Sequence, residues 1–256
     1  MNLKGQTAII SGGLGDIGRA IALELAADGA NVSLGDVLPP DQAGGFLEQL
    51  RGYDVSAMYT QMDIRDASAV ASWIHETASE AGLGIPSLII SNAGIVTRAS
   101  FLDITNEQWD NEFAVNVGGA LSMCRSAAQL LIQNGLPGKI VLVGSWAAHR
   151  PNKAIPAYCA SKAALRMLGQ VMAMELAGHG ITVGEVAPGA VNAGLSAKNL
   201  QAMTPEQIEA KIPVGTWIRP EEVAWQVAHL CDPRNANMTG SVVVMDGGLS
   251  LTSKWT

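Results

Sequence analysis

Two side chains with complementary acid–base chemistry stand four residues apart in the second half of the chain. Tyr158 and Lys162 lie in an Ala- and Leu-rich stretch, residues 157–177, whose apolar positions have helical spacing. Residues i and i+4 of a helix share a face, so the phenol and the ammonium point the same way. A nearby cation lowers the pKa of tyrosine, which is about 10 in a free side chain. The spacing predicts a proton-transfer pair, although an amphipathic surface helix produces the same spacing by chance.

A glycine-rich turn follows the first apolar segment of the chain. Residues 7–10 lead into Ser11–Gly18, with the sequence SGGLGDIG, and residues 19–28 have helical spacing. A strand, turn and helix of this kind present backbone N–H groups and a helix N-terminus to a pyrophosphate. Glycine permits the close approach because it has no Cβ atom. The turn indicates a dinucleotide site, with an unliganded tight turn as the alternative.

An acidic residue ends the second apolar segment, residues 31–35. Asp36 stands about 20 residues beyond the glycine turn, where a carboxylate can accept both ribose hydroxyls of adenosine. The same carboxylate would repel a 2′-phosphate, so the position favours NAD over NADP. A solvated loop aspartate is the alternative.

The elements that must position these residues form a regular series. Short apolar runs alternate with helical segments at residues 7–10, 31–35, 55–59, 87–90, 139–143, 181–186 and 241–245. This alternation predicts an α/β fold of the Rossmann type, a doubly wound, seven-stranded parallel sheet with helices on both faces, in a single domain over residues 1–256. Ligands bind at the carboxyl ends of such strands. The candidate residues fall there or on the following helix: Gly12, Asp36, Asp63, Asn92, Ser145 and Pro188.

The order and spacing of these motifs resemble the short-chain dehydrogenase/reductase family over nearly the whole chain. The matching positions are the Ser11–Gly18 turn, Asp63, Asn92-Ala93-Gly94, Asn116, Ser145, Tyr158 with Lys162, Pro188-Gly189 and Asp246-Gly247-Gly248. The resemblance implies a Rossmann fold, a nicotinamide cofactor and a catalytic tetrad of Asn116, Ser145, Tyr158 and Lys162.

The resemblance also implies a role for each member of the tetrad. Tyr158 exchanges a proton with the substrate oxygen, and Ser145 hydrogen-bonds that oxygen. Lys162 lowers the pKa of the tyrosine and holds the nicotinamide ribose, while Asn116 holds a water that links the lysine to solvent.

Further positions carry over to the cofactor. Asp63 and Ile64 are expected along the adenine, and Asn92 beside its ribose. The full set of expected cofactor contacts is Gly12, Leu14, Asp16, Ile17, Asp36, Asp63, Ile64, Asn92, Ala93, Gly94, Tyr158, Lys162, Pro188, Gly189 and Val191.

The chain departs from the family pattern at two positions. Asp16 occupies a place that is usually glycine, and its carboxylate is expected to point away from the pyrophosphate while favouring the helix dipole. Ala193 occupies the place of a threonine that bonds the nicotinamide carboxamide. Either Asn192 substitutes for that threonine or the hydrogen bond is missing.

Substrate contacts are expected around Ser145 and Tyr158. Trp146 is either a wall for a sugar ring or core filler, and His149 is either a substrate contact or a loop histidine. Residues 193–212 are polar and interrupt the strand–helix rhythm, which predicts a mobile lid over the substrate. No grouping of His and Cys residues in the sequence suggests a metal.

Composition narrows the partners and the compartment. The net charge is −7 without a basic run, which argues against nucleic acid and anionic membranes. Three widely spaced cysteines read as reduced thiols, and the N-terminus lacks the design of a signal peptide, so a cytoplasmic protein is expected. The resemblance implies a homotetramer, with interface candidates in residues 106–133 and 157–177 and at Leu249, Leu251 and Trp255.

These observations favour an NAD-dependent dehydrogenase that acts on a secondary alcohol of a polyol- or sugar-like molecule. A 3-oxoacyl-type carbonyl reductase is an alternative, but Asp36 and the scarcity of basic residues in 106–121 count against it. A non-catalytic cofactor-binding sensor is a second alternative, but it would predict a broken tetrad.

Overall fold

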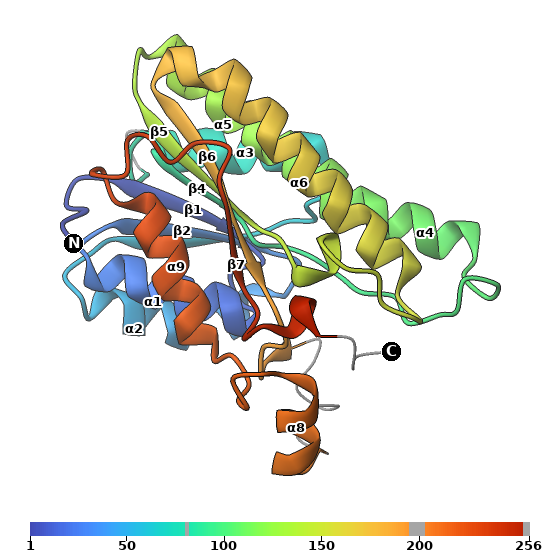
Figure 1. The fold of residues 1–256 in the computed structure, drawn as a ribbon. Coiled ribbons are helices and arrows are strands. Elements are labelled where there is room, and N and C mark those ends of the chain that lie inside the picture. The colour runs from blue at the N-terminus through green and yellow to red at the C-terminus, as the bar shows by residue number, and fades with distance from the viewer. Residues whose placement is uncertain (80–81, 195–202, 253–256) are drawn as a thin grey trace.

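The computed structural model describes residues 1–79, 82–194 and 203–252, which build a seven-stranded sheet flanked by helices (Figure 1). All neighbouring strands are parallel, and their order is β3-β2-β1-β4-β5-β6-β7. The strands are β1 (Thr7–Ser11), β2 (Asn31–Asp36), β3 (Ala57–Gln61), β4 (Leu88–Ser91), β5 (Gly138–Val143), β6 (Ile181–Pro188) and β7 (Val242–Met245). The predicted Rossmann-type sheet is confirmed.

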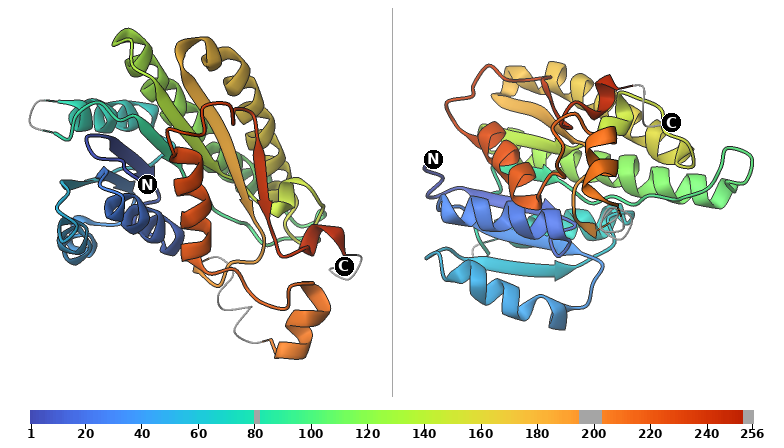
Figure 2. Two further views of the ribbon diagram at one scale, coloured as in Figure 1. Left: turned by 60° about the vertical axis from the view of Figure 1, so that its left-hand side comes forward. Right: turned by 60° about the horizontal axis from the view of Figure 1, so that its bottom comes forward.

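Helices cover both faces of the sheet (Figures 1 and 2). On one face lie α1 (Asp16–Ala27), α2 (Gly44–Arg51) and α9 (Pro220–Cys231); on the other lie α3 (Ala67–Ala78), α5 (Ala120–Gln133) and α6 (Pro156–Leu176). α4 (Asn106–Phe113) precedes α5, and α8 (Pro205–Lys211) lies beyond the carboxyl edge of the sheet. Short 3₁₀ turns are η1 (Pro40–Gln42), η3 (Trp146–Ala148), η4 (Ala177–His179) and η5 (Leu249–Leu251). Among the described residues, no helix is both long and apolar enough to cross a membrane.

Strand β1 shows why the apolar runs are continuous and do not alternate with polar residues. Successive side chains of a strand point to opposite faces. Ala8 and Ile10 pack with the α1 and α9 side, whereas Ile9 packs with the α3 and α5 side. Because both faces are covered by helices, both sets of side chains must be apolar.

The strand order reverses direction between β1 and β4, since the chain builds outward from β1 to β3 and then crosses to β4. In doubly wound sheets this switch point opens a crevice at the carboxyl ends of the strands. β1, β2, β4, β5 and β6 all deliver the residues that follow them to this edge.

The helical stretch predicted at residues 106–133 is not a uniform α-helix. α4 begins with a capping box at Thr105, and residues 114–119 (η2, Ala114–Gly119) form a π-helix before α5 continues. Single π turns inside α-helices are often found at functional sites. Here the π turn carries Asn116.

Candidate active site

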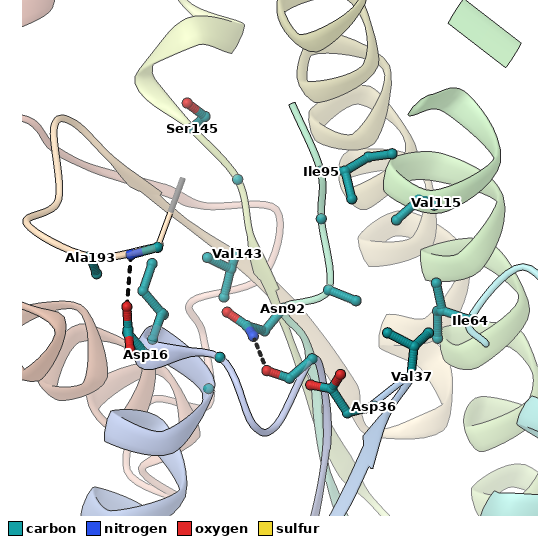
Figure 3. Close-up of a pocket in the computed structure, with 18 of the residues that line it drawn as sticks. Asp16, Asp36, Val37, Ile64, Asn92, Ile95, Val115, Val143, Ser145 and Ala193 are labelled. Atoms are coloured by element: carbon teal, nitrogen blue, oxygen red, sulfur yellow. Dashed lines mark hydrogen bonds between the residues drawn. The ribbon is translucent and has the colours of Figure 1, made fainter. Parts of the chain in front are cut away.

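One pocket of about 510 Å³ runs along the carboxyl edge of the sheet (Figure 3). Its lining includes all but Leu14 of the residues expected to bind the cofactor, together with Ser145. Leu14 is buried, and it contributes its backbone N–H, which donates to Asp36 Oδ2 at 3.0 Å. The fold therefore places the predicted cofactor and proton-transfer residues around a single cavity.

The glycine turn is tight enough to require glycine at two positions. Gly12 has φ +63°, and a Cβ atom there would lie 3.0 Å from Ala93 Cα. A Cβ on Gly18 would lie 2.2 Å from the Gly12 carbonyl oxygen. Asn92 Nδ2 donates to the carbonyls of Ser11 and Gly12, each at 3.0 Å, and so fixes the turn against β4. The resulting cradle of backbone beside a helix N-terminus fits a pyrophosphate.

Asp36 ends β2 and presents its carboxylate to the pocket (Figure 3). Besides Leu14 N–H, it accepts a hydrogen bond from Leu38 N–H at 3.3 Å. A carboxylate has about four lone-pair sites, so both oxygens can still accept from a diol. The basic side chains in the described lining are Arg65 and Lys162, and Arg65 is already paired with Asp63 through its Nε at 3.0 Å from both carboxylate oxygens.

Tyr158, Ser145 and Lys162 converge at the other end of the pocket. Tyr158 lies in the first turn of α6, which begins with Pro156, and Lys162 follows one turn later. The Lys162 ammonium lies 5.7 Å from the centre of the Tyr158 ring and donates to the Val143 carbonyl at 2.9 Å. β5, through Val143 and the Ser145 that follows it, therefore meets α6 at the expected proton-transfer pair.

The pKa of Tyr158 departs from the expectation. It is raised, chiefly because burial disfavours the phenolate; hydrogen bonding with Ser145 opposes the shift, and the Glu112 carboxylate adds to it. The spacing with Lys162 had predicted a lowered pKa. That expectation is wrong in this structure because burial of the phenol outweighs the influence of Ser145. The Lys162 ammonium donates to Val143, and burial lowers the pKa of the lysine to about 8.

Asn116 lies behind the pocket wall and is 1% exposed. Its Nδ2 donates to the Ile95 carbonyl and to Ser161 Oγ, both at 3.0 Å, and its Oδ1 accepts from Ile95 N–H at 2.9 Å. Both amide hydrogens are therefore engaged, which ties α6 to the loop after β4. Any water held by this side chain has only the remaining lone pair of Oδ1 available.

The two departures from the family pattern lie side by side. Asp16 Oδ2 accepts a hydrogen bond from Gly194 N–H at 2.7 Å, so the carboxylate of the first α1 residue faces the segment after β6 (Figure 3). The side chain turns toward this segment but still lines the pocket, contrary to a fully outward orientation. Ala193 also lines the pocket, whereas Asn192 is exposed and does not. This favours a missing hydrogen bond over substitution by Asn192.

The residues expected to contact the substrate, Trp146 and His149, differ in their surroundings. Trp146 is 6% exposed and packs with Ala190, Ile212 and Leu249, which favours core filler over a sugar platform. His149 is exposed, and its Nδ1 lies 3.0 Å from Arg166 Nη1. Within the predicted lid, residues 195–202 lie outside the described residues. The described remainder includes α8 and Ile212, which covers Trp146.

Two buried carboxylates near the site were not predicted. Glu112 of α4 is 0% exposed, and its Oε2 accepts from Thr97 N–H at 2.9 Å. Glu185 of β6 is 3% exposed. The sequence carried one signal for the second residue, since Glu185 interrupts an otherwise apolar run with a charge. Among the described residues, no group of three His, Cys, Asp or Glu side chains is arranged to hold a metal.

The Pro188-Gly189 loop is supported by the C-terminal motif. A Cβ on Gly189 would lie 2.7 Å from Asp246 Cα, so the two segments are in close backbone contact. The Asp246 carboxylate accepts from Gly248 N–H at 2.9 Å and Ser250 N–H at 2.7 Å. The terminal motif therefore acts by bracing the pocket wall.

Comparison with known proteins agrees with this geometry. A family model described as enoyl-(acyl carrier protein) reductase matches residues 13–250. Sorbitol dehydrogenase from Cereibacter sphaeroides is 30% identical, covering 97% of this chain and 98% of its own. L-2,3-butanediol dehydrogenase from Corynebacterium glutamicum is 32% identical, covering 95% and 98%. The crystal structure of a short-chain type dehydrogenase/reductase from Mycobacterium marinum superposes with a TM-score of 0.91 at 30% identity, over 98% of each chain.

The chain therefore belongs to the short-chain dehydrogenase/reductase family, whose members are oxidoreductases that use NAD or NADP.

Proposed function

We propose that the protein is an NAD-dependent dehydrogenase that interconverts a polyol- or sugar-like secondary alcohol and its ketone or lactone. The observation that carries the proposal is the convergence of Ser145, Tyr158 and Lys162 at one end of a pocket with Asp36 at the other. A bound nicotinamide ring would supply the hydride acceptor or donor.

The residues at the reactive end have complementary roles in this proposal. Tyr158 takes the proton of the substrate hydroxyl during oxidation and returns it during reduction. Ser145 hydrogen-bonds the same oxygen and stabilises the charge that develops on it. Because burial raises the pKa of Tyr158, the phenolate needs a compensating charge during the reaction. Lys162, whose ammonium lies 5.7 Å from the centre of the Tyr158 ring, would be the cation that supplies it.

The other end of the pocket supports NAD. Asp36 would accept the adenosine ribose hydroxyls and oppose a 2′-phosphate. Asp63 and Ile64 would lie along the adenine, and Asn92 would hold the turn beneath the ribose and pyrophosphate. Arg65 is paired with Asp63, so it is not free to rescue a phosphate at Asp36.

A polar alcohol is supported by the relatives that are named as sorbitol and butanediol dehydrogenases. An acyl carrier substrate matches the description of the family model, but the net charge of −7 opposes docking of an acidic carrier. We also propose that the described part of the predicted lid covers the substrate, that His149 lies near the substrate, and that the enzyme is a cytoplasmic homotetramer.

The test is a turnover assay with NAD and NADP across sorbitol, rhamnose, 2,3-butanediol and an acetoacetyl thioester. We expect NAD-dependent oxidation of at least one of the polar alcohols. Turnover of the thioester alone would favour the carbonyl reductase. Binding of NADH without turnover of any substrate would favour a sensor.

A further inference from the structure

We infer that Glu185 is a positioning residue for the proposed reaction, acting by holding Lys162 in its ammonium form. This inference rests on the proposed dehydrogenase function. Glu185 lies in the middle of β6, three residues before Pro188, and faces the same side of the sheet as Val183, which packs under α6. A charged side chain is thus placed in the layer between the sheet and the catalytic helix.

The site is shaped to admit a carboxylate. A Cβ atom on Gly144 would lie 1.9 Å from Glu185 Oε1 and 2.6 Å from its Cδ, so only glycine leaves room for the acid. Gly144 stands between Val143, whose carbonyl accepts from Lys162, and Ser145. The Glu185 carboxylate therefore lies against the backbone segment that contacts the catalytic residues.

Neither oxygen of Glu185 has a hydrogen-bond partner among the described residues. An unpaired carboxylate is costly to bury unless nearby charges compensate it. The cations that act on it, Lys162 and Arg166, come from successive turns of α6. Lys139 of β5 is two residues from Val141 and points to the same face as Val141, which is the face opposite Glu185. The neighbouring elements η3 and β7 carry no titratable side chain. Arg166 in turn contacts the exposed side chain of His149.

The coupling runs in both directions. Glu185 is the largest favourable influence on the Lys162 ammonium, ahead of Glu112, while burial pulls the pKa of Lys162 down to about 8. Burial raises the pKa of Glu185 to about 7, and Lys162 opposes that rise. Above about pH 7 the Glu185 carboxylate is ionised and favours the ammonium form of Lys162, whose pKa is about 8.

Glu185 differs from Glu112 in the groups whose pKa it shifts. Glu112 raises the pKa of Tyr158 as well as acting on Lys162. Glu185 has no such influence on Tyr158. A change at Glu185 therefore perturbs the lysine without directly perturbing the tyrosine.

The kinetic test is the pH profile of kcat/KM for Glu185→Gln. Without the carboxylate the pKa of Lys162 falls, so the alkaline limb should move to lower pH by about one unit. The control is Glu175→Gln, which removes one negative charge from an exposed position on α6, the helix that carries Lys162. An alkaline limb that coincides with that of the wild type would overturn the inference.

A stability measurement tests the same coupling without turnover. The folded-state pKa of Glu185 is raised from 4.5 to about 7, so the folded protein binds this proton more tightly and loses stability as pH rises through that window. The Tm of Glu185→Gln should fall less between pH 4.5 and pH 7 than the Tm of the wild type.

In Lys162→Met the loss of stability with rising pH should continue above pH 7, because the cation that opposes the rise in the pKa of Glu185 is gone. The comparison of Lys162→Met with Lys162→Met/Glu185→Gln isolates the Glu185 contribution. If the Glu185-dependent loss of stability is complete at the same pH with and without Lys162, the two groups are not coupled and the inference is wrong. If Glu185→Gln does not fold, the pH profile of Tm in Lys162→Met alone decides. If no substrate is turned over, the proposed function fails while these profiles still test the coupling.

Discussion

At Tyr158 the fold opposes the charge state that the proposed chemistry needs. Burial raises the pKa of the phenol, and Glu112 adds to the shift. The hydrogen bond with Ser145 favours the phenolate, whereas the ammonium of Lys162 is bonded to the Val143 carbonyl in this structure. The acid–base function of tyrosine thus depends on neighbouring residues more than on the tyrosine itself.

Replacing Tyr158 by phenylalanine should abolish turnover and spare cofactor binding. Loss of the proton donor and acceptor removes on the order of 10²–10⁴ in kcat, whereas the ring still packs in the pocket wall. The measurements are steady-state kcat and the Kd of NADH by fluorescence. Tyr53→Phe, at an exposed tyrosine, is the control. A variant that retained a tenth of the wild-type kcat would remove Tyr158 from the acid–base role.

Asp36 should decide between the two cofactors. Hydrogen bonds to a charged group contribute roughly 1.5–3 kcal/mol each, so the wild type should prefer NAD by on the order of a hundredfold in kcat/KM. Asp36→Ala should narrow this ratio by raising the KM for NAD. Because Asp36 also accepts from Leu14 and Leu38 N–H, Asp36→Asn is the matched variant that keeps one acceptor oxygen. Equal use of NADP by the wild type would contradict the assignment.

At the scale of elements, the arrangement of strand ends was predictable and their local detail was not. Apolar runs and glycine positions identify the strands and the turn because burial and steric exclusion act on residue type directly. β3 illustrates the limit, since residues 55–59 were expected and the strand is Ala57–Gln61. The boundary depends on pairing with β2, which a single run of sequence does not contain.

Site details that depend on tertiary contacts were also beyond the sequence. The π-helix that carries Asn116 lies where the α4–α5 stretch meets the loop after β4, and Asn116 makes two hydrogen bonds to Ile95 of that loop. The Lys162–Val143 hydrogen bond joins α6 to β5 across 19 residues. Neither contact has a signature in residue spacing. The charge of Glu185 within an apolar strand, in contrast, is visible in the sequence.

The contact between α1 and the segment after β6 leads to a prediction about Asp16. Its carboxylate lines the pocket at the helix N-terminus, where a bound pyrophosphate would add like charge. Asp16→Asn keeps an acceptor for Gly194 N–H and removes the charge. The Kd of NADH should fall on the order of fivefold, and added salt should shrink the difference. Calorimetric titration measures it, with the exposed Asp41→Asn as control. Weaker binding by Asp16→Asn would show that the carboxylate aids the cofactor.

The whole molecule leaves apolar side chains exposed on two neighbouring helical stretches. On α6, Met167, Val171 and Met174 recur at helical spacing, and Met174 is 83% exposed. Trp109 on α4, which stacks on Phe113, and Leu121 on α5 are also exposed. At the C-terminus, Leu249 is buried within its own chain and is therefore not an interface residue, Leu251 is exposed, and Trp255 lies outside the described residues. Exposed apolar patches of this kind mark association surfaces.

We therefore expect a homotetramer in which the α4–α5 stretch and α6 pair across a two-fold axis. A two-fold interface brings the same face of two copies together. A charge introduced once in the sequence is therefore buried in both copies at the axis. Val171→Glu combined with Met174→Glu should yield dimers, because two unpaired carboxylates would be buried per chain. Multi-angle light scattering at micromolar concentration measures the mass, and Tyr53→Glu, an exposed residue beyond α2, should remain tetrameric. A wild-type protein that elutes as a monomer, or a double variant that stays tetrameric, would rule out this face as the interface.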